Sequence, residues 1–382
     1  MKKKFISKIL NTLINILFLS SSIIIPLILF EFIYSRTEEK PVYAKFKRSI
    51  RLREHPPSRS ISIIPSDIYL SNSDNLEKKP YRIRTDEESY IMPSTVHENP
   101  DHNIIFLGGS TTECLFLEEN DRFPYLVGRA LEKKIDQKFN TFNSGVSGNN
   151  SMHSINIFLN KGLKLRPKIA VMLHSSNDLT SMLHMRNYWG KSSTRSLIVS
   201  ESNTRLNHRS ITYRIRNLFP HNYAKLQSYL LRKSTRDEFV DNRGKGLEVN
   251  KELLLNDFSS SLQSFIDVSK AWNVEPVLMT MMNRLKSNPD KIIEDWLKSI
   301  DQDFDLDYGK YRLLFKEFNQ VVRDLGKKNN ILVIDLAKEV PKTSDYMHDY
   351  VHLTKKGSRF VSETIANKLS EKFFTENQND LK

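Results

Sequence analysis

The chain has 382 residues, of which 39% are hydrophobic and 27% charged, so it is long enough to bury a substantial core. Its one cysteine, Cys114, excludes an intrachain disulfide and a metal site built from several cysteines. The net charge of +13 is uneven: residues 1–60 and 186–250 each carry a formal +8, and the remainder carries −3. Such basic segments are either solvated surface or sites for anionic lipid head groups and polyanionic glycans. Nucleic acid is not an expected partner, because no recognisable nucleic-acid-binding motif is present.

The N-terminal segment predicts a membrane anchor. Residues 9–30 contain no charged side chain, and a helix of that length would span about 33 Å, enough for a bilayer core. The lysines before this segment would keep the short N-terminus in the cytoplasm. We therefore expect a single-pass cell membrane protein whose main body is periplasmic or extracellular. A cleaved signal peptide is the alternative, although no A-x-A cleavage site is evident.

Residues 35–100 are polar, basic and interrupted by prolines, which predicts a stem and lead-in. From residue 101 onward, short apolar runs alternate with amphipathic stretches, which indicates βαβ units and a parallel sheet. This pattern predicts a three-layer α/β/α sandwich with a five-stranded, mostly parallel sheet. The basic residues 185–250 interrupt the alternation and are expected to form a cap or substrate-binding insertion. The predicted strand segments are 103–108, 139–148 (a strand end and its turn), 167–178 (a strand with a polar end), 274–282 and 330–337. The predicted helices are 121–135, 151–164, 252–273, 311–329 and 354–374.

A glycine-rich turn follows the first predicted strand. Gly108 and Gly109 allow the backbone to bend sharply and to expose Ser110 at the head of a helix. In that position Ser110 could act as a nucleophile, and its own N–H could face an oxyanion. Ser110 could instead cap the helix, or the loop could bind a phosphate. Neither glycine pattern of the common nucleotide-binding loops is present.

Two further polar clusters follow the next two strands. Gly148 lies in a tight turn within Asn143–Ser151 and could offer an unobstructed backbone N–H. Asn177 lies within His174–Leu179 and carries an amide that could stabilise a developing negative charge. Asn and Gly are also ordinary turn and capping residues, so each cluster alone remains compatible with a structural role.

The fourth cluster precedes the last predicted helix, which Thr354 is expected to cap. Asp349 and His352 are three residues apart, a spacing at which a carboxylate can hold an imidazole in one tautomer. His348 and His352 also resemble the ends of a helical H-E-x-x-H zinc motif. That motif requires a continuous helix, which Pro341 and the turn residues nearby disfavour. Plain surface histidines are the remaining alternative, and we expect no metal.

Together, the order and placement of these four clusters resemble the SGNH family of GDSL-type hydrolases over residues 101–372. The resemblance implies a flavodoxin-like fold with Ser110 as nucleophile, His352 as general base and Asp349 orienting His352. It also implies an oxyanion hole made by the backbone N–H groups of Ser110 and Gly148 and the side chain of Asn177. The motifs in this chain are "FLGGSTTE", "NSGVSGNNS", "HSSNDL" and "DYVHLTKKG".

Two positions depart from the family pattern: Gly109 stands where Asp is common, and Ser175 stands where Gly is usual. The "GGSTT" form is more similar to membrane-anchored members than to secreted lipases. We therefore expect a membrane-anchored serine esterase that acts, without a cofactor, on O-acyl esters of envelope glycans or lipids, with acetyl favoured, through an acyl-serine intermediate. An O-acyltransferase and a non-catalytic module that binds envelope polymers are the alternatives. The expected domains are an anchor (1–34), a stem (35–100) and a hydrolase domain (101–374).

Overall fold

The computed structural model describes residues 11–26, 29, 46–190, 192, 194–202, 239 and 242–375. The chain divides into two compact units. One comprises Met1–Ser49 and Ser200–Thr235, and the other comprises Ile50–Val199 and Arg236–Lys382. Every site residue that the sequence predicts belongs to the second unit, which we call the α/β domain.

A five-stranded sheet forms the centre of the α/β domain, and all of its strand pairs are parallel. Its strand order is β5-β4-β6-β8-β9, so the chain starts at β4, adds β5 on one side and then crosses to β6 on the other. Open α/β sheets bind ligands at such a reversal, outside the carboxyl ends of the strands. The five predicted strands are confirmed as β4 (His102–Gly108), β5 (Phe139–Asn143), β6 (Ile169–Leu173), β8 (Glu275–Met279) and β9 (Leu332–Ile334).

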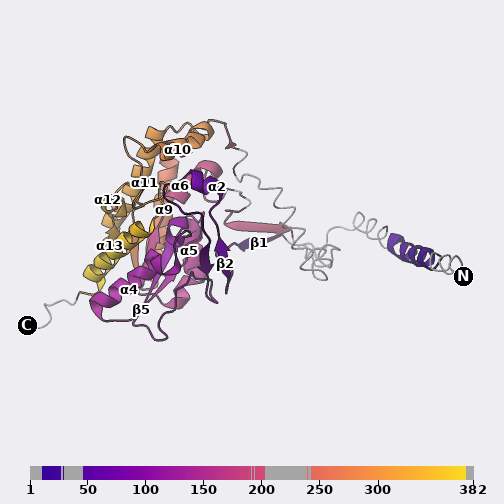
Figure 1. The fold of residues 1–382 in the computed structure, drawn as a ribbon, viewed down its shortest axis with the longest axis horizontal. Coiled ribbons are helices and arrows are strands. Elements are labelled where there is room, and N and C mark those ends of the chain that lie inside the picture. The colour runs from indigo at the N-terminus through magenta and orange to yellow at the C-terminus, as the bar shows by residue number, and fades with distance from the viewer. Residues whose placement is uncertain are drawn as a thin grey trace, which may run out of the picture. The chain divides into compact units, whose positions relative to one another are not determined.

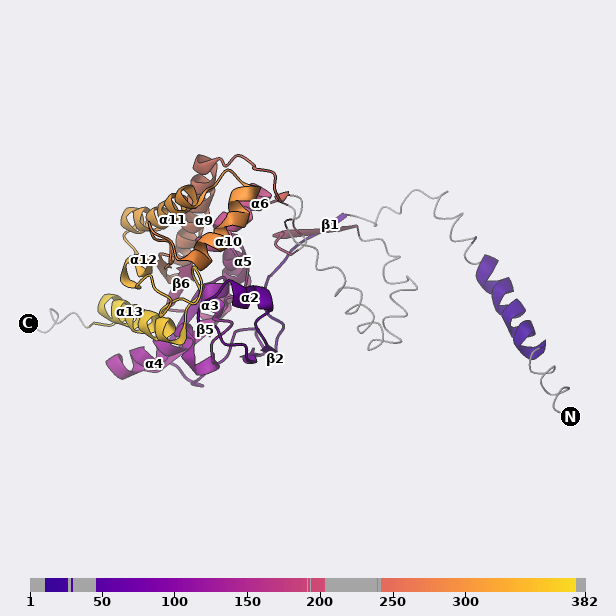
Figure 2. The same ribbon diagram turned by 45° about the horizontal axis from the view of Figure 1, so that its top comes forward.

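Helices cover both faces of the sheet. Every residue of β5 and β6 is buried, and because successive strand residues point to opposite faces, both faces must be covered. Helix α4 packs against α13, while α9 packs against α5 and α11 (Figure 1 and Figure 2). The five predicted helices are confirmed as α4 (Phe123–Ile135), α5 (Ser151–Asn160), α9 (Lys251–Ala271), α11 (Tyr308–Asn329) and α13 (Lys355–Phe373).

The N-terminal part of the α/β domain is more structured than its composition suggests. Strands β2 (Ser60–Ile63) and β3 (Tyr81–Arg84) form an antiparallel pair, and α2 (Asp67–Ser71) lies between them in sequence. Tyr81, Ile83, Tyr90 and Ile91 of this region are buried. Consequently the compact unit begins at Ile50, whereas the sequence placed the start of the folded domain at residue 101. Other apolar residues of this segment, such as Ile64 and Ile68, stay exposed, so composition alone does not reveal which of them pack.

The remaining elements are short or peripheral. They are β1 (Phe46–Ile50), α3 (Ser110–Glu113), η1 (Glu119–Asp121), η2 (Gly162–Leu165), α6 (Ser176–Met185), β7 (Ile198–Ser202), α10 (Lys291–Asp303) and α12 (Leu336–Glu339). The predicted insertion at 185–250 lies largely outside the described residues, because 203–238 are not among them.

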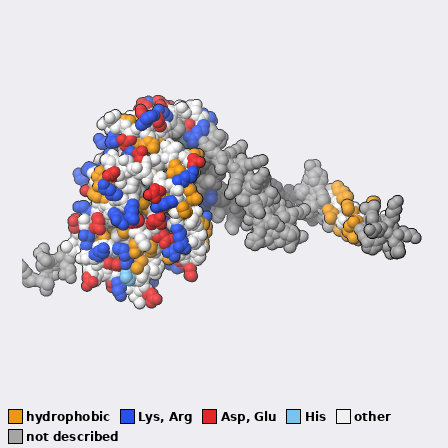
Figure 3. Space-filling view, viewed as in Figure 1, with side chains coloured by type: hydrophobic (Ala, Val, Ile, Leu, Met, Phe, Trp, Pro, Cys, Tyr) orange, Lys and Arg blue, Asp and Glu red, His pale blue; other side chains and the backbone are white. Residues whose placement is uncertain are grey.

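The described part of the N-terminal segment is a helix over residues 11–26. Its apolar side chains are exposed, including Phe18 at 77% and Leu19 at 67% (orange in Figure 3). Within the portion of the chain that the structure describes, no helix combines the length and the apolar character needed to cross a membrane.

Candidate active site

Three side chains predicted from separate parts of the sequence form a hydrogen-bonded series. Strand β4 ends at Gly108, and Ser110 begins the short helix α3. The Ser110 Oγ lies 2.7 Å from His352 Nε2, although the two residues are 242 positions apart. On the far side of the imidazole, His352 Nδ1 lies 2.5 Å from Asp349 Oδ2. The geometry is that of a nucleophile, a base and a group that orients the base.

The loop that carries Asp349 and His352 is held by local hydrogen bonds. Asp349 Oδ1 accepts the backbone N–H groups of Val351 at 2.9 Å and His352 at 2.7 Å. Helix α13 starts directly afterwards, and its N-cap Thr354 accepts the N–H of Gly357 at 3.1 Å. The imidazole is therefore oriented by a turn whose partners are all close in sequence.

Interactions within this series shift the pKa values of Asp349 and His352 in opposite directions. Burial tends to raise the pKa of Asp349, but the charge and hydrogen bonds of His352 outweigh it and hold that pKa well below its usual range. Burial tends to lower the pKa of His352, yet the Asp349 carboxylate raises it above its usual value. With Nδ1 donating to the carboxylate, Nε2 of the neutral imidazole is left to accept the Ser110 proton.

Steric contacts explain why glycines precede Ser110. A Cβ at Gly109 would lie 2.1 Å from Nδ2 of Asn177, and one at Gly108 would lie 2.1 Å from Oγ1 of Thr112. Gly109 thus lets the Asn177 amide approach the turn that presents Ser110. The second departure from the family pattern is Ser175, whose φ of 178° lies outside the left-handed region that favours glycine.

The predicted donors of the oxyanion hole border a common space. Gly148 has φ +81°, a left-handed conformation that favours glycine. Asn177 Nδ2 donates to the carbonyl of Asn149 at 2.9 Å, which joins the two donor-bearing loops. Ser110, Gly148 and Asn177 all line a cavity of about 580 Å³ that also borders Asp349 and His352. The structure therefore brings together all five residues that the sequence singled out.

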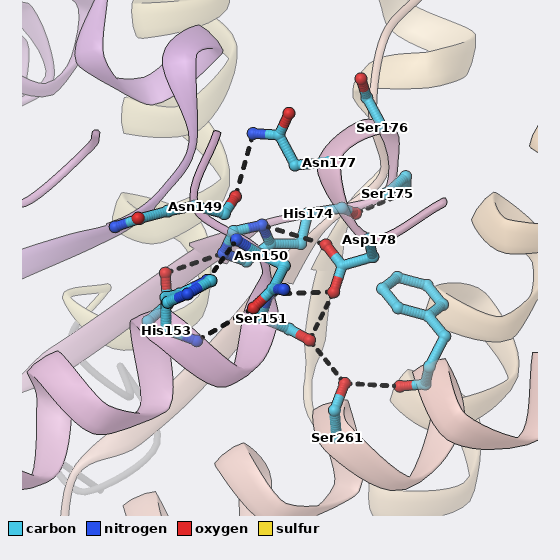
Figure 4. A network of polar contacts seen from close by, with 12 residues as sticks. Asn149, Asn150, Ser151, His153, His174, Ser175, Ser176, Asn177, Asp178 and Ser261 are labelled. Carbon is cyan, nitrogen blue, oxygen red and sulfur yellow. Dashed lines mark hydrogen bonds and ion pairs between the residues drawn. The ribbon is translucent and has the colours of Figure 1, made fainter. Parts of the chain in front are cut away.

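A buried polar network, which sequence reasoning missed, ties the same two loops together (Figure 4). Asp178, the neighbour of Asn177, is fully buried. Its Oδ1 accepts the backbone N–H of Ser151 at 2.9 Å, the Ser151 hydroxyl at 2.5 Å and the Tyr188 hydroxyl at 2.7 Å. Ser151 begins α5, directly after the loop that contains Gly148.

Further partners keep Asp178 ionised and extend the network to other helices. Its Oδ2 lies 3.3 Å from His174 Nδ1. Burial raises the pKa of Asp178, but His174 and the Ser151 donors lower it, and the net pKa lies below the usual value. The Ser151 hydroxyl also lies 2.6 Å from that of Ser261 on α9, and His174 Nε2 lies 2.8 Å from the Ser154 hydroxyl on α5.

Other residues that line the larger cavity come from segments that were interpreted from their composition alone. Arg53 and Tyr69 belong to the region predicted to be a stem, and Arg195 belongs to the predicted insertion. An aromatic wall is formed by Trp296 of α10 stacked on Tyr350, with ring centroids 4.1 Å apart. No periodic or motif signal marks Arg53, Tyr69 or Arg195, whereas Tyr350 lies inside the "DYVH" stretch.

A second, much smaller cavity also reaches Ser110. Its volume is about 20 Å³, which is about the space of one water-sized group. Much of its lining is apolar, and it consists of Tyr69, Ser110, Thr111, Cys114, Leu115, Phe116, Leu117, Ser147, His348, His352 and Leu353.

The helical zinc motif that His348 and His352 could have formed is absent, because residues 348–352 are not helical. The two imidazoles stack instead, with centroids 5.7 Å apart. His348 Nδ1 lies 3.3 Å from the Ser73 hydroxyl, and burial lowers the pKa of His348 to about 4. Among the described residues, no group of three or more His, Cys, Asp or Glu side chains is arranged to hold a metal ion.

Comparison with known proteins identifies one family and several distant structures. The model of the GDSL-like lipase/acylhydrolase family matches residues 106–360. A lipase/acylhydrolase from Enterococcus faecalis is 14% identical, with 71% of this chain and 96% of that chain covered and a TM-score of 0.41. An acetylxylan esterase from Geobacillus stearothermophilus is 13% identical, with 71% and 95% covered and a TM-score of 0.40. No curated protein matches the chain.

Proposed function

Because the chain belongs to the GDSL-like lipase/acylhydrolase family, we propose that it is a serine esterase with Ser110 as nucleophile, His352 as general base and Asp349 as the residue that orients His352. One observation carries this assignment. The Ser110 hydroxyl lies 2.7 Å from His352 Nε2, while His352 Nδ1 lies 2.5 Å from the Asp349 carboxylate. A serine hydroxyl is a weak nucleophile until a base removes its proton, and this geometry supplies that base.

In the proposed reaction, Ser110 Oγ attacks the ester carbonyl carbon while His352 Nε2 takes the hydroxyl proton. The carbonyl oxygen becomes an oxyanion, for which the N–H groups of Ser110 and Gly148 and the amide of Asn177 are the proposed donors. His352 then protonates the departing alcohol, and an acyl-serine remains. Water, deprotonated by His352, attacks the acyl carbon and releases the carboxylic acid together with free Ser110.

The size of the small cavity favours a short acyl group. With a volume of about 20 Å³ beside Ser110, it accommodates a group of about the size of a methyl and no long chain. The larger cavity of about 580 Å³ on the side of Gly148 and Asn177 is left for the alcohol portion. This division supports acetyl esters as substrates.

The membrane anchor and the envelope substrate belong to the same proposal. Residues 9–30 are uncharged. Within the described helix, the hydroxyls of Ser20, Ser21 and Ser22 donate to backbone carbonyls of the preceding turn, at 2.8, 3.0 and 2.8 Å. Such internal hydrogen bonds reduce the cost of placing serine in hydrocarbon. An enzyme tethered outside the cytoplasmic membrane would meet acetylated glycans or lipids of the envelope as its substrates.

A fluorophosphonate probe tests the central assignment on the full chain in detergent. We expect the probe to label the wild type and not Ser110→Ala, and we expect acetyl esters to be hydrolysed much faster than butyryl and octanoyl esters. Labelling that persists in Ser110→Ala would refute the assignment of Ser110 as the nucleophile.

Product analysis with and without a glycan acceptor separates hydrolysis from acyl transfer. Resistance of the protein to alkaline extraction from membranes tests the anchor separately.

A further inference from the structure

Four residues border both of the cavities that reach the nucleophile. They are Ser110 and His352, the proposed nucleophile and base, together with Tyr69 and Ser147. If the small cavity holds the acyl group and the larger one receives the alcohol portion, the reacting carbon lies where the two cavities meet. Ser147 therefore lies beside the bond that forms and breaks, and the reaction described above gives it no role.

The loop that carries Ser147 packs closely on α3, the short helix of the nucleophile. Gly145 in this loop has no room for a side chain, since a Cβ there would lie 2.3 Å from the backbone nitrogen of Glu113. Asn143 Nδ2 donates to the Thr112 carbonyl at 2.9 Å, which joins the start of the loop to the same helix. The position of Ser147 relative to the nucleophile is thus set by packing within the protein.

A buried carboxylate sets the direction of the Ser147 hydroxyl. Glu113 of α3 is 3% exposed, and its Oε2 accepts the hydrogen of Ser147 Oγ. The other carboxylate oxygen, Oε1, lies 3.0 Å from His55 Nε2. An ionised carboxylate accepts hydrogen bonds and donates none, so the hydroxyl proton of Ser147 points at Glu113. The Ser147 oxygen can then act toward a substrate only as an acceptor, through its lone pairs.

The two kinds of molecule that could attack the acyl-serine differ in the number of hydrogens that they carry. When water attacks, one proton goes to His352 Nε2 and the second hydrogen stays on the water oxygen. A hydrogen bond from that second hydrogen to a fixed acceptor would hold the water in the orientation for attack. An alcohol has one hydroxyl hydrogen, which it gives to His352, so it has none left for a second acceptor.

We propose that Ser147 Oγ accepts the second hydrogen of the water that hydrolyses the acyl-serine, and so favours hydrolysis over transfer to an alcohol. This inference rests on the proposed esterase function and assigns one further residue to its second step. In that step the water oxygen bonds to the acyl carbon while His352 Nε2 takes one proton. The bond from this carbon to Ser110 Oγ then breaks, and His352 returns the proton to Ser110 Oγ.

Partition of the acyl-enzyme between water and methanol tests the proposal on the full chain in detergent. Phenyl acetate supplies the acyl group, and the ratio of methyl acetate to acetate is measured after subtraction of the Ser110→Ala background. We expect Ser147→Ala to raise this ratio by about 2- to 10-fold, the usual effect of one lost hydrogen bond. Both products come from the same acyl-enzyme, so slower acylation or a smaller folded fraction leaves the ratio unaffected. An unchanged ratio in Ser147→Ala would overturn the proposal.

Three further variants separate the hydrogen bond from the space that alanine opens. Ser147→Cys places a larger atom at the same position, and because sulfur is a weak acceptor, the ratio should rise as in Ser147→Ala. Ser147→Thr keeps the hydroxyl and should not raise the ratio. Ser144→Ala is the matched control from the same loop, since the Ser144 hydroxyl donates to the Phe106 carbonyl at 2.8 Å and lines neither of the two cavities. A ratio that falls in Ser147→Cys would show that Ser147 acts through its size, which would also overturn the proposal.

Failure of the esterase assignment would look different. A wild type that releases neither product, and on which mass spectrometry finds no acetyl group at Ser110, refutes the proposed function and the role of Ser147 with it. A wild type that forms methyl acetate and no acetate refutes the preference for water. Turnover to both products with equal ratios in wild type and Ser147→Ala refutes the role of Ser147 alone.

Discussion

The two sides of the Ser110 hydroxyl are built in different ways. On the acid–base side, Asp349 holds His352 within one turn, through hydrogen bonds between residues at most three positions apart. On the side of the proposed oxyanion hole, the oxyanion side, Gly148 and Asn177 lie on separate loops, which are joined by the hydrogen bond from Asn177 to Asn149 and by that from Ser151 to Asp178. A local turn can orient a base by itself, whereas a pocket for an oxyanion depends on packing between distant segments. Substitutions on the two sides should therefore have different consequences.

The largest effect that distinguishes the sides is expected for Asp349→Asn. Loss of the orienting carboxylate should lower kcat by about 10⁴-fold, because the imidazole is no longer held in the productive tautomer. The pH profile should move as well. The wild-type rate should rise with pH as His352 loses its proton, around a pKa that Asp349 raises above the usual 6.5. Without the carboxylate, that pKa falls, so the rise should shift to lower pH.

Two measurements check this prediction. One is kcat/KM as a function of pH for both proteins, and the other is the far-ultraviolet circular dichroism spectrum, which should stay unchanged because the turn is local. An ascending limb at the same pH in both proteins would mean that a group other than His352 is the base.

A smaller loss is expected on the oxyanion side for Asn177→Ala. Removal of one oxyanion donor costs about 10²- to 10³-fold in kcat in known cases, with little change in KM. The matched control is Asn160→Ala, because the Asn160 side chain donates to the Asn156 carbonyl of its own helix, at 2.8 Å. Steady-state kinetics with an acetyl ester measures kcat and KM for both variants. A loss confined to KM would show that Asn177 binds substrate and does not stabilise the oxyanion.

The same contrast explains how much the sequence could predict. Strand and helix periodicities are local, so the five strands and five helices of the sandwich were predictable, with shifts of a few residues at their ends. Because parallel strands end at one edge of a sheet, the clusters around Ser110, Gly148 and Asn177 could also be expected to meet. The spacing of Asp349 and His352 made their pairing one of several candidates, and the order of the four clusters favoured it over a zinc motif and over plain surface histidines.

The features that could not be predicted from the sequence depend on contacts between residues that are far apart along the chain. The start of the domain was placed at residue 101, but Ile91 N–H donates to the Asn143 carbonyl at 2.9 Å, and the packed unit begins at Ile50. Gly109 counted as a departure from the family pattern, and its reason, the proximity of the Asn177 amide, is visible only in three dimensions. Arg53 carries no local signal at all. The predicted anchor at 9–30 is described only in part, so it stays a prediction.

An intermediate effect is expected for Asp178→Asn, which acts through the loops and not on the substrate. The amide cannot accept all of the donors that converge on the carboxylate, so Asn177 and the Gly148 loop should shift. Misplacement of a catalytic group by about 1 Å costs up to about 10²-fold, and we expect a fall in kcat of about tenfold. Asp178 is a positioning residue in this view.

A double-mutant cycle in kcat distinguishes a positioning role of Asp178 from a purely structural one. If Asp178 acts through Asn177, the losses of Asp178→Asn and Asn177→Ala should not add in kcat. Stability should fall too, by about 1–3 kcal/mol at neutral pH, because buried donors lose their acceptor. Since the folded-state pKa of Asp178 is depressed, its contribution is present above the ordinary pKa of Asp and is lost as the pH falls through the folded-state value. Fully additive losses in kcat would refute the positioning role.

The smallest effect tests whether the acid–base side is truly local. Thr354→Ala removes the N-cap of α13, whose side chain accepts the N–H of Gly357, and should cost about 1 kcal/mol of unfolding free energy in a urea titration. The Asp349–His352 turn makes its own hydrogen bonds, so kcat should stay within about twofold of the wild type, the usual size of an effect below 0.5 kcal/mol. A fall in kcat of the size expected for Asp178→Asn would show that the start of α13 helps to position His352. Both sides of Ser110 would then depend on tertiary contacts, and they would differ only in how far apart in sequence the contacting residues are.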